Sequence, residues 1–287
     1  MAIANFVPEI WSASLLEALR NQLVYAQAGV INRDYEGDIA QAGDTVHITS
    51  FADPAVRDYT KNGTITWDLL TDSGQVFTVD QADYFAFKVD DIDRRQALPG
   101  FIDSTTQGAS YNLATSTDTY LSGVMAAGVD AGNQVGAVTV DPSTPTEAYD
   151  LVVAMRTLLV RANIPAAGRF LIVPPELYAV MLHDDRFVRY DASGTTDGLR
   201  NGMVGRIAGF DVIESNTVPE TAGAYTVLAG HSMATTFAEQ IAKVQGISPL
   251  ENTFGDGVRG LHVYGAKVIR PTALASAVVT VGAPDED

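Results

Sequence analysis

Residues 230–234 (Gly-His-Ser-Met-Ala) come closest to a catalytic motif, because they follow a predicted strand as a nucleophile elbow does. Asp256 and His262 come later in the chain, in the Ser…Asp…His order of the α/β-hydrolases. Two features argue against catalysis: Ala234 stands where the elbow has glycine, and the acid and base are only six residues apart. We therefore predict a turn at the end of a strand, and a hydrolase that uses Ser232 is the least favoured alternative.

The histidines are too widely spaced to form a recognisable metal-binding motif. None lies three or four residues from another, and the chain has no cysteine that could complete a zinc site. The lack of cysteine also excludes disulfides, iron–sulfur clusters and a thiol nucleophile. The four histidines are His47, His183, His231 and His262.

Two acidic stretches offer oxygen ligands but lack the rest of a calcium loop. Residues 90–93 (Asp-Asp-Ile-Asp) precede Arg94 and Arg95, which favours a charge-paired surface, a candidate contact between subunits. Residues 191–198 have no distal carboxylate, which favours a flexible polar loop. No acid, base and nucleophile form one constellation. The sequence therefore predicts a protein that is not an enzyme, with no catalytic residues, no metal site and no cofactor.

The composition is short of charge and strongly acidic. Hydrophobic residues make up 46% of the chain and charged residues 18%, with a net charge of −17, whereas about 25% of residues are charged in a typical soluble protein. Clustered Lys and Arg that would grip phosphate backbones are missing. No apolar run approaches the roughly 18 residues that span a bilayer, and the first residues lack the positive start of a signal peptide. The few charges indicate surface that is buried against other subunits.

Two patterns near the start of the chain favour segments that reach beyond their own core. Apolar residues from Trp11 to Ala26 recur at three- and four-residue steps, which predicts an amphipathic helix that packs either on its own core or on a neighbour. Over residues 44–90 the period changes to two, and Asn62-Gly63 favours a tight hairpin turn. We predict a long antiparallel ribbon whose apolar face needs another surface to cover it.

The remainder of the chain alternates between helical and extended patterns. Helical spacing over residues 102–128 predicts a long helix ended by Gly128. A second helix is predicted with Thr144 as its cap, Pro145 at its first position and Glu147 completing a capping box. Strands are predicted over 169–173, 210–213, 225–229, 235–244, 258–269 and 277–281. The fold class is therefore α+β.

Three stretches of the sequence have the character of family signatures. They are residues 164–175 (IPAAGRFLIVPP), 209–216 (GFDVIESN) and 254–268 (FGDGVRGLHVYGAKV). In this order, they resemble the major capsid (coat) proteins of tailed bacteriophages, which have the Hong Kong 97-type fold. The order of the predicted elements agrees with that family along nearly the whole chain.

The resemblance implies a division of the chain into the parts of the tailed-phage capsid fold. These would be an N-terminal arm (1–43), an extended β-hairpin loop reaching over a neighbour (44–90), a peripheral domain with a long spine helix (91–135), an axial domain (136–234), long strands of the peripheral domain (235–270), and the final axial strand with an acidic C-terminus (271–287).

The resemblance also implies a function. The protein would self-assemble as pentamers and hexamers into the icosahedral shell that encloses the double-stranded DNA of a tailed phage, without sequence-specific binding. It would reside in the virion, after assembly in the host bacterial cytoplasm, with a separate scaffolding protein, a portal and a decoration protein as further partners. An encapsulin-like nanocompartment that packages an enzyme is the alternative. Some family shells carry a Lys–Asn isopeptide bond, for which Lys61 is a candidate donor, although a solvated turn suits this lysine better.

Overall fold

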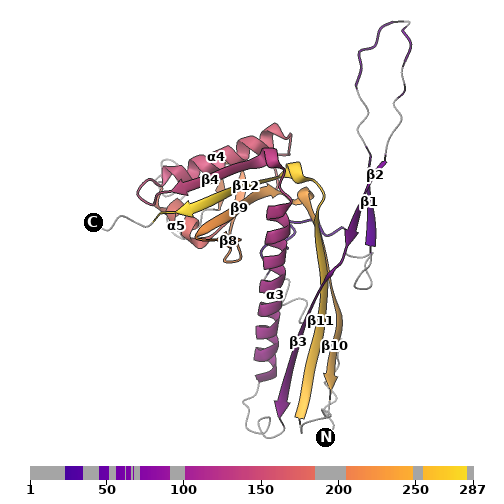
Figure 1. Ribbon diagram of the computed structural model, residues 1–287, viewed down its shortest axis with the longest axis vertical. Coiled ribbons are helices and arrows are strands. Elements are labelled where there is room, and N and C mark those ends of the chain that lie inside the picture. Colours follow the sequence, from indigo (N-terminus) through magenta and orange to yellow (C-terminus); the bar gives the residue numbers. More distant parts are fainter. Residues whose placement is uncertain are drawn as a thin grey trace.

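The fold combines a mixed sheet covered by helices, a long helix beside three long strands, and a projecting hairpin (Figure 1). The computed structural model describes residues 23–34, 45–51, 56–61, 63–65, 67, 72–90, 101–184, 205–247 and 255–282. Most of the predicted helix between Trp11 and Ala26 lies outside these residues. The mixture of helices and sheets confirms the predicted α+β fold class.

The mixed sheet has the strand order β4-β12-β9-β5-β7-β6, and β8 pairs with β9. β4 runs parallel to β12 and β5 parallel to β7, while the other pairs are antiparallel. β5 is central and buried along its whole length, which explains why its sequence is an uninterrupted apolar run after Arg169. The strands are β4 (Gln134–Val140), β5 (Arg169–Val173), β6 (Arg206–Ile207), β7 (Phe210–Glu214), β8 (Glu220–Thr221), β9 (Ala224–His231) and β12 (Leu274–Val281).

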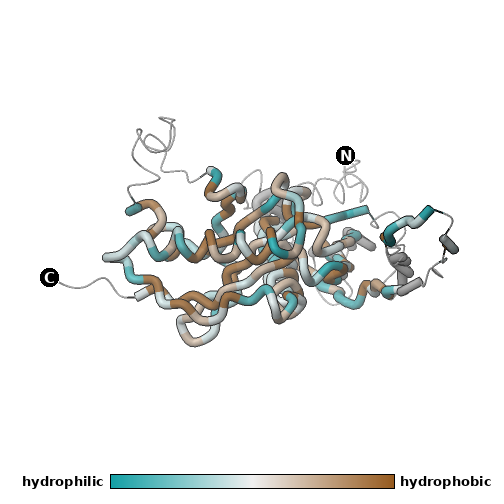
Figure 2. Tube along the Cα trace, turned by 90° about the horizontal axis from the view of Figure 1, so that it is seen from above, coloured by the Kyte–Doolittle hydropathy of each residue, from teal (hydrophilic) through white to brown (hydrophobic). Residues whose placement is uncertain are grey.

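Both faces of the mixed sheet are covered. Leu171 of β5 packs into a core with α4 (Thr146–Arg161) and α5 (Pro175–His183), whereas its neighbour Phe170 packs into a second core with α3 (Phe101–Ala127). Successive side chains of a strand point to opposite faces, so one strand supplies both cores. Seen from above, hydrophobic residues run through the middle of this lobe (Figure 2).

The second lobe consists of α3 and a three-stranded antiparallel sheet, β10-β11-β3. Its strands are β3 (Gln81–Asp90), β10 (Thr235–Ile247) and β11 (Gly255–Val268). Leu121 and Met125 of α3 are fully buried and share a core with Phe237 and Tyr264 of the sheet. The helix stops where it was predicted to stop, since the N–H of Gly128 donates to the carbonyl oxygens of Val124 and Met125.

The hairpin is shorter than the predicted ribbon. β1 (Thr45–Phe51) pairs antiparallel with β2 (Asp72–Thr78), but β3 pairs with β11 in the other lobe. A period of two indicates a strand but does not show which strand it pairs with. Here the partner of β3 is β11, which lies far along the chain. Beyond the paired strands, residues 63–65 and 67 are not in a regular strand, contrary to the alternation of the sequence.

Two local predictions need correction. The turn at the tip has Gly63 donating its N–H to the carbonyl oxygen of Thr60, so Gly63 is the last residue of the turn and not a central one. Glycine is favoured at the last position of such a turn. The helix α4 is capped by Pro145 without a side-chain bond, and the carboxylate of Glu147 accepts from the N–H of Asp141 instead.

Three short 3-10 helices complete the described chain. They are η2 (Ala131–Asn133), η3 (Ser232–Ala234) and η4 (Pro271–Ala273). The amide of Asn133 donates to the carbonyl oxygens of Thr272 and Leu274, at 2.8 and 3.0 Å. This side chain therefore ties η2 to η4 and to the start of β12.

Candidate subunit-contact surfaces

The tip of the hairpin carries large hydrophobic side chains that nothing in the described chain covers. Trp67 is 89% exposed, Tyr59 is 76% exposed, and Val56 and Ile65 are exposed as well. Figure 1 shows that the described segment between β1 and β2 extends beyond the ends of these strands, away from both lobes. Single exposed apolar residues are ordinary on a protein surface, but a cluster at one projecting tip marks a contact surface.

The base of the hairpin is held firmly. Phe77 of β2 is fully buried and packs with Ala238 and Val263 on the three-stranded sheet. The ammonium group of Lys267 donates to the carbonyl oxygen of Val76 at 2.7 Å, and the amide of Gln75 donates to that of Ile269. The hairpin is therefore held to the rest of the chain at its base, while its tip is exposed to solvent.

A groove runs between α3 and β3. It has a volume of about 890 Å³. On β3 the carboxylate of Asp83 accepts hydrogen bonds from the hydroxyls of Ser116, at 2.7 Å, and Tyr264, at 2.8 Å. Burial, and next the hydrogen bond to Asp83, raise the pKa of Tyr264, so this hydroxyl stays protonated and donating. The groove is lined by residues 82–87 of β3 and by Gly108, Ala109, Asn112, Leu113 and Ser116 of α3.

The groove is suited to contact with a hydrophobic side chain of another molecule. Tyr84 is 78% exposed beside it, and Tyr111, one turn from Gly108 on α3, is 61% exposed. Its lining combines aromatic and small side chains with the Asp83 carboxylate. Sequence reasoning missed this groove, because it depends on the pairing of β3 with β11, which no local pattern reveals.

The least favoured alternative, a hydrolase, lacks its triad, because Ser232 and His262 lie far apart. Ser232 lies in η3, directly after β9, which confirms the turn at the end of a strand. Val268 of β11 pairs with Thr235 beside this turn, so His262, six residues away, lies roughly 20 Å further along the strand. There the ring of His262 is buried, with its Nε2 3.4 Å from a carboxylate oxygen of Glu239.

The histidines and acidic stretches that were considered as metal ligands and set aside do not form a site in the described parts of the chain. No group of three or more His, Asp or Glu side chains that could hold a metal is found in the described parts of the chain. His231 accepts a hydrogen bond from the N–H of Met233, and burial lowers its pKa. His183 is the last residue of α5. Residues 91–93 and 191–198 lie outside the described residues.

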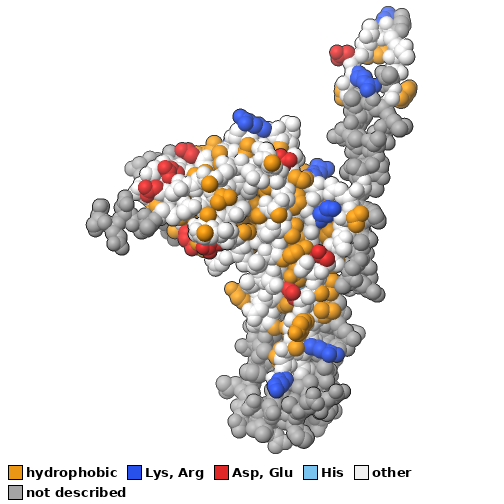
Figure 3. Space-filling model, viewed as in Figure 1, with side chains coloured by type: hydrophobic (Ala, Val, Ile, Leu, Met, Phe, Trp, Pro, Cys, Tyr) orange, Lys and Arg blue, Asp and Glu red, His pale blue; other side chains and the backbone are white. Residues whose placement is uncertain are grey.

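Charge is unevenly spread over the described surface. On the face drawn in Figure 3, several acidic side chains lie over the lobe with α4 and α5, whereas the hairpin tip and the lobe with the long strands carry both acidic and basic side chains. None of the helices that the structure describes is both long enough and apolar enough to cross a membrane.

Comparison with known proteins identifies the family of this chain. Residues 71–277 match the family model described as phage capsid protein. A chain from Mycobacterium phage Che8 is 32% identical, with a TM-score of 0.73 over 96% of this chain and 98% of that one. Comparison with curated proteins finds no significant match.

More distant structures share the fold. A chain from the capsid structure of the Cyanophage P-SCSP1u is 12% identical, with a TM-score of 0.73 over 91% of this chain and 89% of that one. A chain from the mature capsid of bacteriophage PhiM1 is 18% identical, with a TM-score of 0.64 over 82% of both chains. Because the family match spans most of the sequence, and the Che8 similarity nearly all of it, this chain belongs to the phage capsid protein family and has the Hong Kong 97-type fold of tailed-phage capsids.

Proposed function

We propose that this protein is the major subunit of a tailed-phage capsid, which self-assembles as pentamers and hexamers into an icosahedral shell around double-stranded DNA. One observation carries the proposal beyond family membership: the hairpin is fixed at its base, while its hydrophobic tip has no covering surface in the described chain. Such a tip is stabilised by contact with another copy. A shell of many copies gives every tip a partner.

The parts of the capsid fold are assigned as follows. Residues 1–43 are the N-terminal arm, and the extended loop begins at residue 44. We end this loop at Asp80 and assign β3 to the peripheral domain with α3, β10 and β11, because β3 completes their sheet. The mixed sheet with α4 and α5 is the axial domain, which supplies the contacts around the five- and six-fold axes.

In the shell, the hairpin tip of one copy lies over the groove between α3 and β3 of the next. The tip offers Tyr59 and Trp67, and the groove offers a space of about 890 Å³ bordered by aromatic side chains. Neighbouring subunits meet at slightly different angles in pentamers and in hexamers. A contact made by the tip of a projecting hairpin suits both angles better than a rigid interface does.

The protein encloses DNA without gripping it and catalyses no reaction. A net charge of −17 opposes tight binding to phosphates. A weakly adhesive, acidic lining would let the genome enter and leave. The shell is a virion component assembled in the bacterial cytoplasm, and a scaffolding protein, a portal and a decoration protein are its further partners. An encapsulin-like shell that packages an enzyme remains the second candidate, because it shares the fold.

Expression of the full chain, followed by electron microscopy of the purified particles, tests the assignment. We expect closed icosahedral shells from the wild type, and mostly unassembled protein from the double variant Tyr59→Ser/Trp67→Ser. The conservative variant Trp67→Phe is the control, because it keeps an aromatic ring at the tip and should form shells. Unfolding midpoints of all unassembled variants should agree, since both side chains are exposed in the single chain.

The results separate the candidates. A wild type that stays monomeric in every condition contradicts a shell protein of either kind. Shells in native host lysates that contain an enzyme and no DNA would favour the nanocompartment. Normal shells from the Tyr59→Ser/Trp67→Ser variant would leave the capsid assignment in place but remove the role of the tip.

A further inference from the structure

The groove between α3 and β3 follows the free edge of a sheet. β3 is the last strand in the order β10-β11-β3, so in the described part of the chain no strand pairs with its other edge. The groove is lined by six consecutive residues of β3, 82–87. Their side chains point alternately to the two faces of the sheet. A groove with this lining runs along the backbone of the strand rather than over one face.

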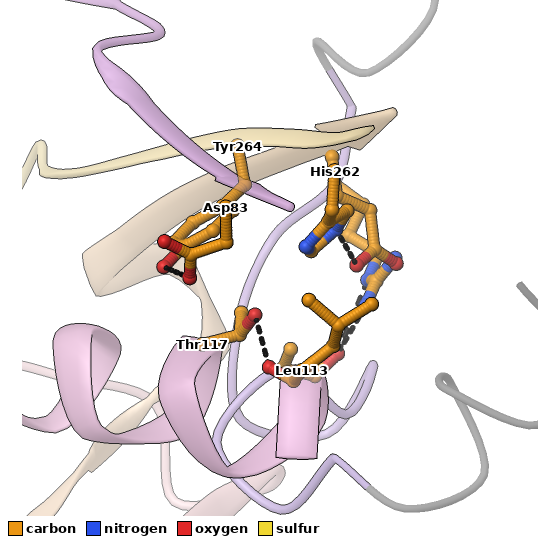
Figure 4. A network of polar contacts seen from close by, with 8 residues as sticks. Asp83, Leu113, Thr117, His262 and Tyr264 are labelled. Carbon is orange, nitrogen blue, oxygen red and sulfur yellow. Dashed lines mark hydrogen bonds and ion pairs between the residues drawn. The ribbon is translucent and has the colours of Figure 1, made fainter. Parts of the chain in front are cut away.

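An unpaired edge presents hydrogen-bonding groups to whatever lies beside it. The backbone N–H and C=O groups of alternate residues point to each side of a strand, so half of those of β3 point away from β11. Proteins commonly shield such an edge with proline or charged side chains. Residues 82–87 contain no proline, and their one charged residue is Asp83, which accepts from the hydroxyl of Ser116 on α3. Figure 4 shows Asp83 and Tyr264 on the side of their strands that faces α3. The edge is therefore open to an added strand.

The hairpin tip contains a strand-like sequence that has no strand partner. Residues 64–67 (Thr-Ile-Thr-Trp) alternate polar and apolar side chains, and all four are of types favoured in strands. Yet residues 63–65 and 67 form no regular strand, and Ile65 and Trp67 are 61% and 89% exposed. The described segment projects away from both lobes, so no strand edge of its own lobes lies beside it (Figure 1).

We propose that residues 63–67 of one copy add a fourth strand to the three-stranded sheet of the next copy, by pairing with the free edge of β3. This rests on the contact between tip and groove proposed above, and it specifies that contact as pairing between two backbones. The pairing satisfies the N–H and C=O groups of β3 that point away from β11. It also gives the alternating sequence of the tip a partner.

The apolar side chains of the two segments match on the face toward α3. Phe85 and Phe87 lie on this face of β3, with their ring centroids 6.4 Å apart. Beside them on α3, a Cβ at Gly108 would meet nothing within 4 Å, so there is room for another side chain. Neighbouring residues of paired strands point to the same face. Ile65 and Trp67 of the added strand therefore lie beside the two phenylalanines.

The polar side chains of the tip then lie on the outer face of the sheet. Successive residues of a strand point to opposite faces, so Thr64 points away from α3 when Ile65 points toward it. On β3 the outer face carries Ala82, Tyr84 and Ala86, all of which are exposed. Thr64 is therefore expected beside one of these three residues.

Charge favours the same two surfaces. The groove contains the carboxylate of Asp83, whereas residues 56–67 of the tip carry two cations, Arg57 and Lys61, against one carboxylate, Asp58. The tip thus brings positive charge to a negative groove, in a chain whose net charge is −17. Opposite charges across a contact favour the correct partner and fix the register.

Cysteine cross-linking of assembled shells tests the pairing, and the chain has no cysteine of its own that could interfere. Six double variants combine Thr64→Cys or Ile65→Cys with Ala82→Cys, Tyr84→Cys or Ala86→Cys. All five side chains are exposed in the single chain, so the substitutions should leave its folding unchanged. A disulfide forms only where the two Cα atoms are about 4.4–6.8 Å apart. After mild oxidation, a denaturing gel without reductant separates links between copies, seen as covalent multimers, from links within one chain.

The expected result alternates along the tip. Thr64→Cys should form covalent multimers with at least one of the three cysteines on β3, because its side chain shares their face. Ile65→Cys should yield at least tenfold less multimer with each of them, because its side chain points to the opposite face. Thr64→Cys combined with Thr157→Cys, an exposed threonine of α4, is the matched control and should stay monomeric on the gel.

Electron microscopy of the same samples separates this inference from the shell function. Shells without multimers in any of the six variants would overturn the pairing and leave the shell function in place, as would equal multimers from Thr64→Cys and Ile65→Cys. A wild type that forms no shells would overturn both.

Hydrogen–deuterium exchange on the wild type decides the question if the double variants do not assemble. Peptides that cover residues 63–67 and 82–87 should exchange at least tenfold more slowly in shells than in the unassembled protein, because their backbone N–H groups become hydrogen-bonded. Equal exchange in the two states would overturn the pairing.

Discussion

Buried carboxylates are the residues that the sequence presented least clearly. Asp118 is one of several polar residues on the buried side of α3, so the sequence alone did not distinguish it. Its meaning was hidden, because its partners, the N–H groups of Val24 and Tyr25, lie more than ninety residues away. In the same way, nothing in the sequence placed Glu239 near His262, because the two residues come together only through the pairing of β10 with β11.

Glu239 gives a prediction at this scale. Because its folded pKa is depressed, the stability it contributes is present above its unfolded value of 4.5 and is lost as pH falls through the folded value. Glu239→Gln removes the charge-assisted bond to Arg33 and should lower the free energy of unfolding by roughly 2 kcal/mol near neutral pH. Chemical denaturation of the unassembled wild type and variant measures this difference in the free energy of unfolding.

The acid dependence and a control complete this test. The loss in Glu239→Gln should shrink as pH falls from 4.5 through the lower folded pKa of Glu239, because the wild type then loses the stability that its charged carboxylate contributes. Glu220→Gln, on an exposed strand end, should change the unfolding free energy by less than about 0.5 kcal/mol. A Glu239→Gln variant as stable as the wild type at neutral pH would mean that the buried ion pair contributes nothing net.

Most helices and strands were predictable as elements. The long helix was expected over 102–128 and spans Phe101–Ala127, and the strand at residues 169–173 was found with the same bounds. Local patterns sufficed there, because the periodic faces are long and strongly apolar. Pairing was not predictable from local patterns, so β3 was assigned to the ribbon instead of to β11.

The packing of the hairpin on the three-stranded sheet explains why the stretch 254–268 has a glycine at position 265. A Cβ at Gly265 would lie 2.8 Å from the carbonyl oxygen of Thr78 and from the Cα of Val79, where β2 leads into β3. Because these are backbone atoms, the contact cannot be relieved by turning a side chain. The hairpin therefore approaches the sheet at a point where only glycine fits.

Gly265→Ala is the corresponding prediction at the scale of elements. It should lower the free energy of unfolding by about 1–3 kcal/mol, because the hairpin base must shift away from β11. Gly123→Ala is the matched control: this glycine lies within α3 with open space around it, and alanine should stabilise the helix by about 0.5–1 kcal/mol. Thermal unfolding of both variants measures the difference, and a stabilised Gly265→Ala would contradict the close approach.

At the scale of the whole molecule, the chain has the features of a part rather than of a self-sufficient globule. Its hydrophobic cores are buried, yet Trp67 and Tyr59 of the hairpin are exposed to solvent, and a groove lies open between α3 and β3. Only 18% of its residues are charged, which suits a surface that other copies cover. Composition indicated such burial, and the resemblance indicated a shell, but neither located the contact.

The contact between tip and groove is the central claim, and a cryo-electron microscopy map of the assembled particle tests it most directly. The account predicts an icosahedral shell in which Tyr59 and Trp67 of each copy are buried in the groove between α3 and β3 of its neighbour. A shell in which these side chains remain in solvent, or contact only their own chain, would contradict it.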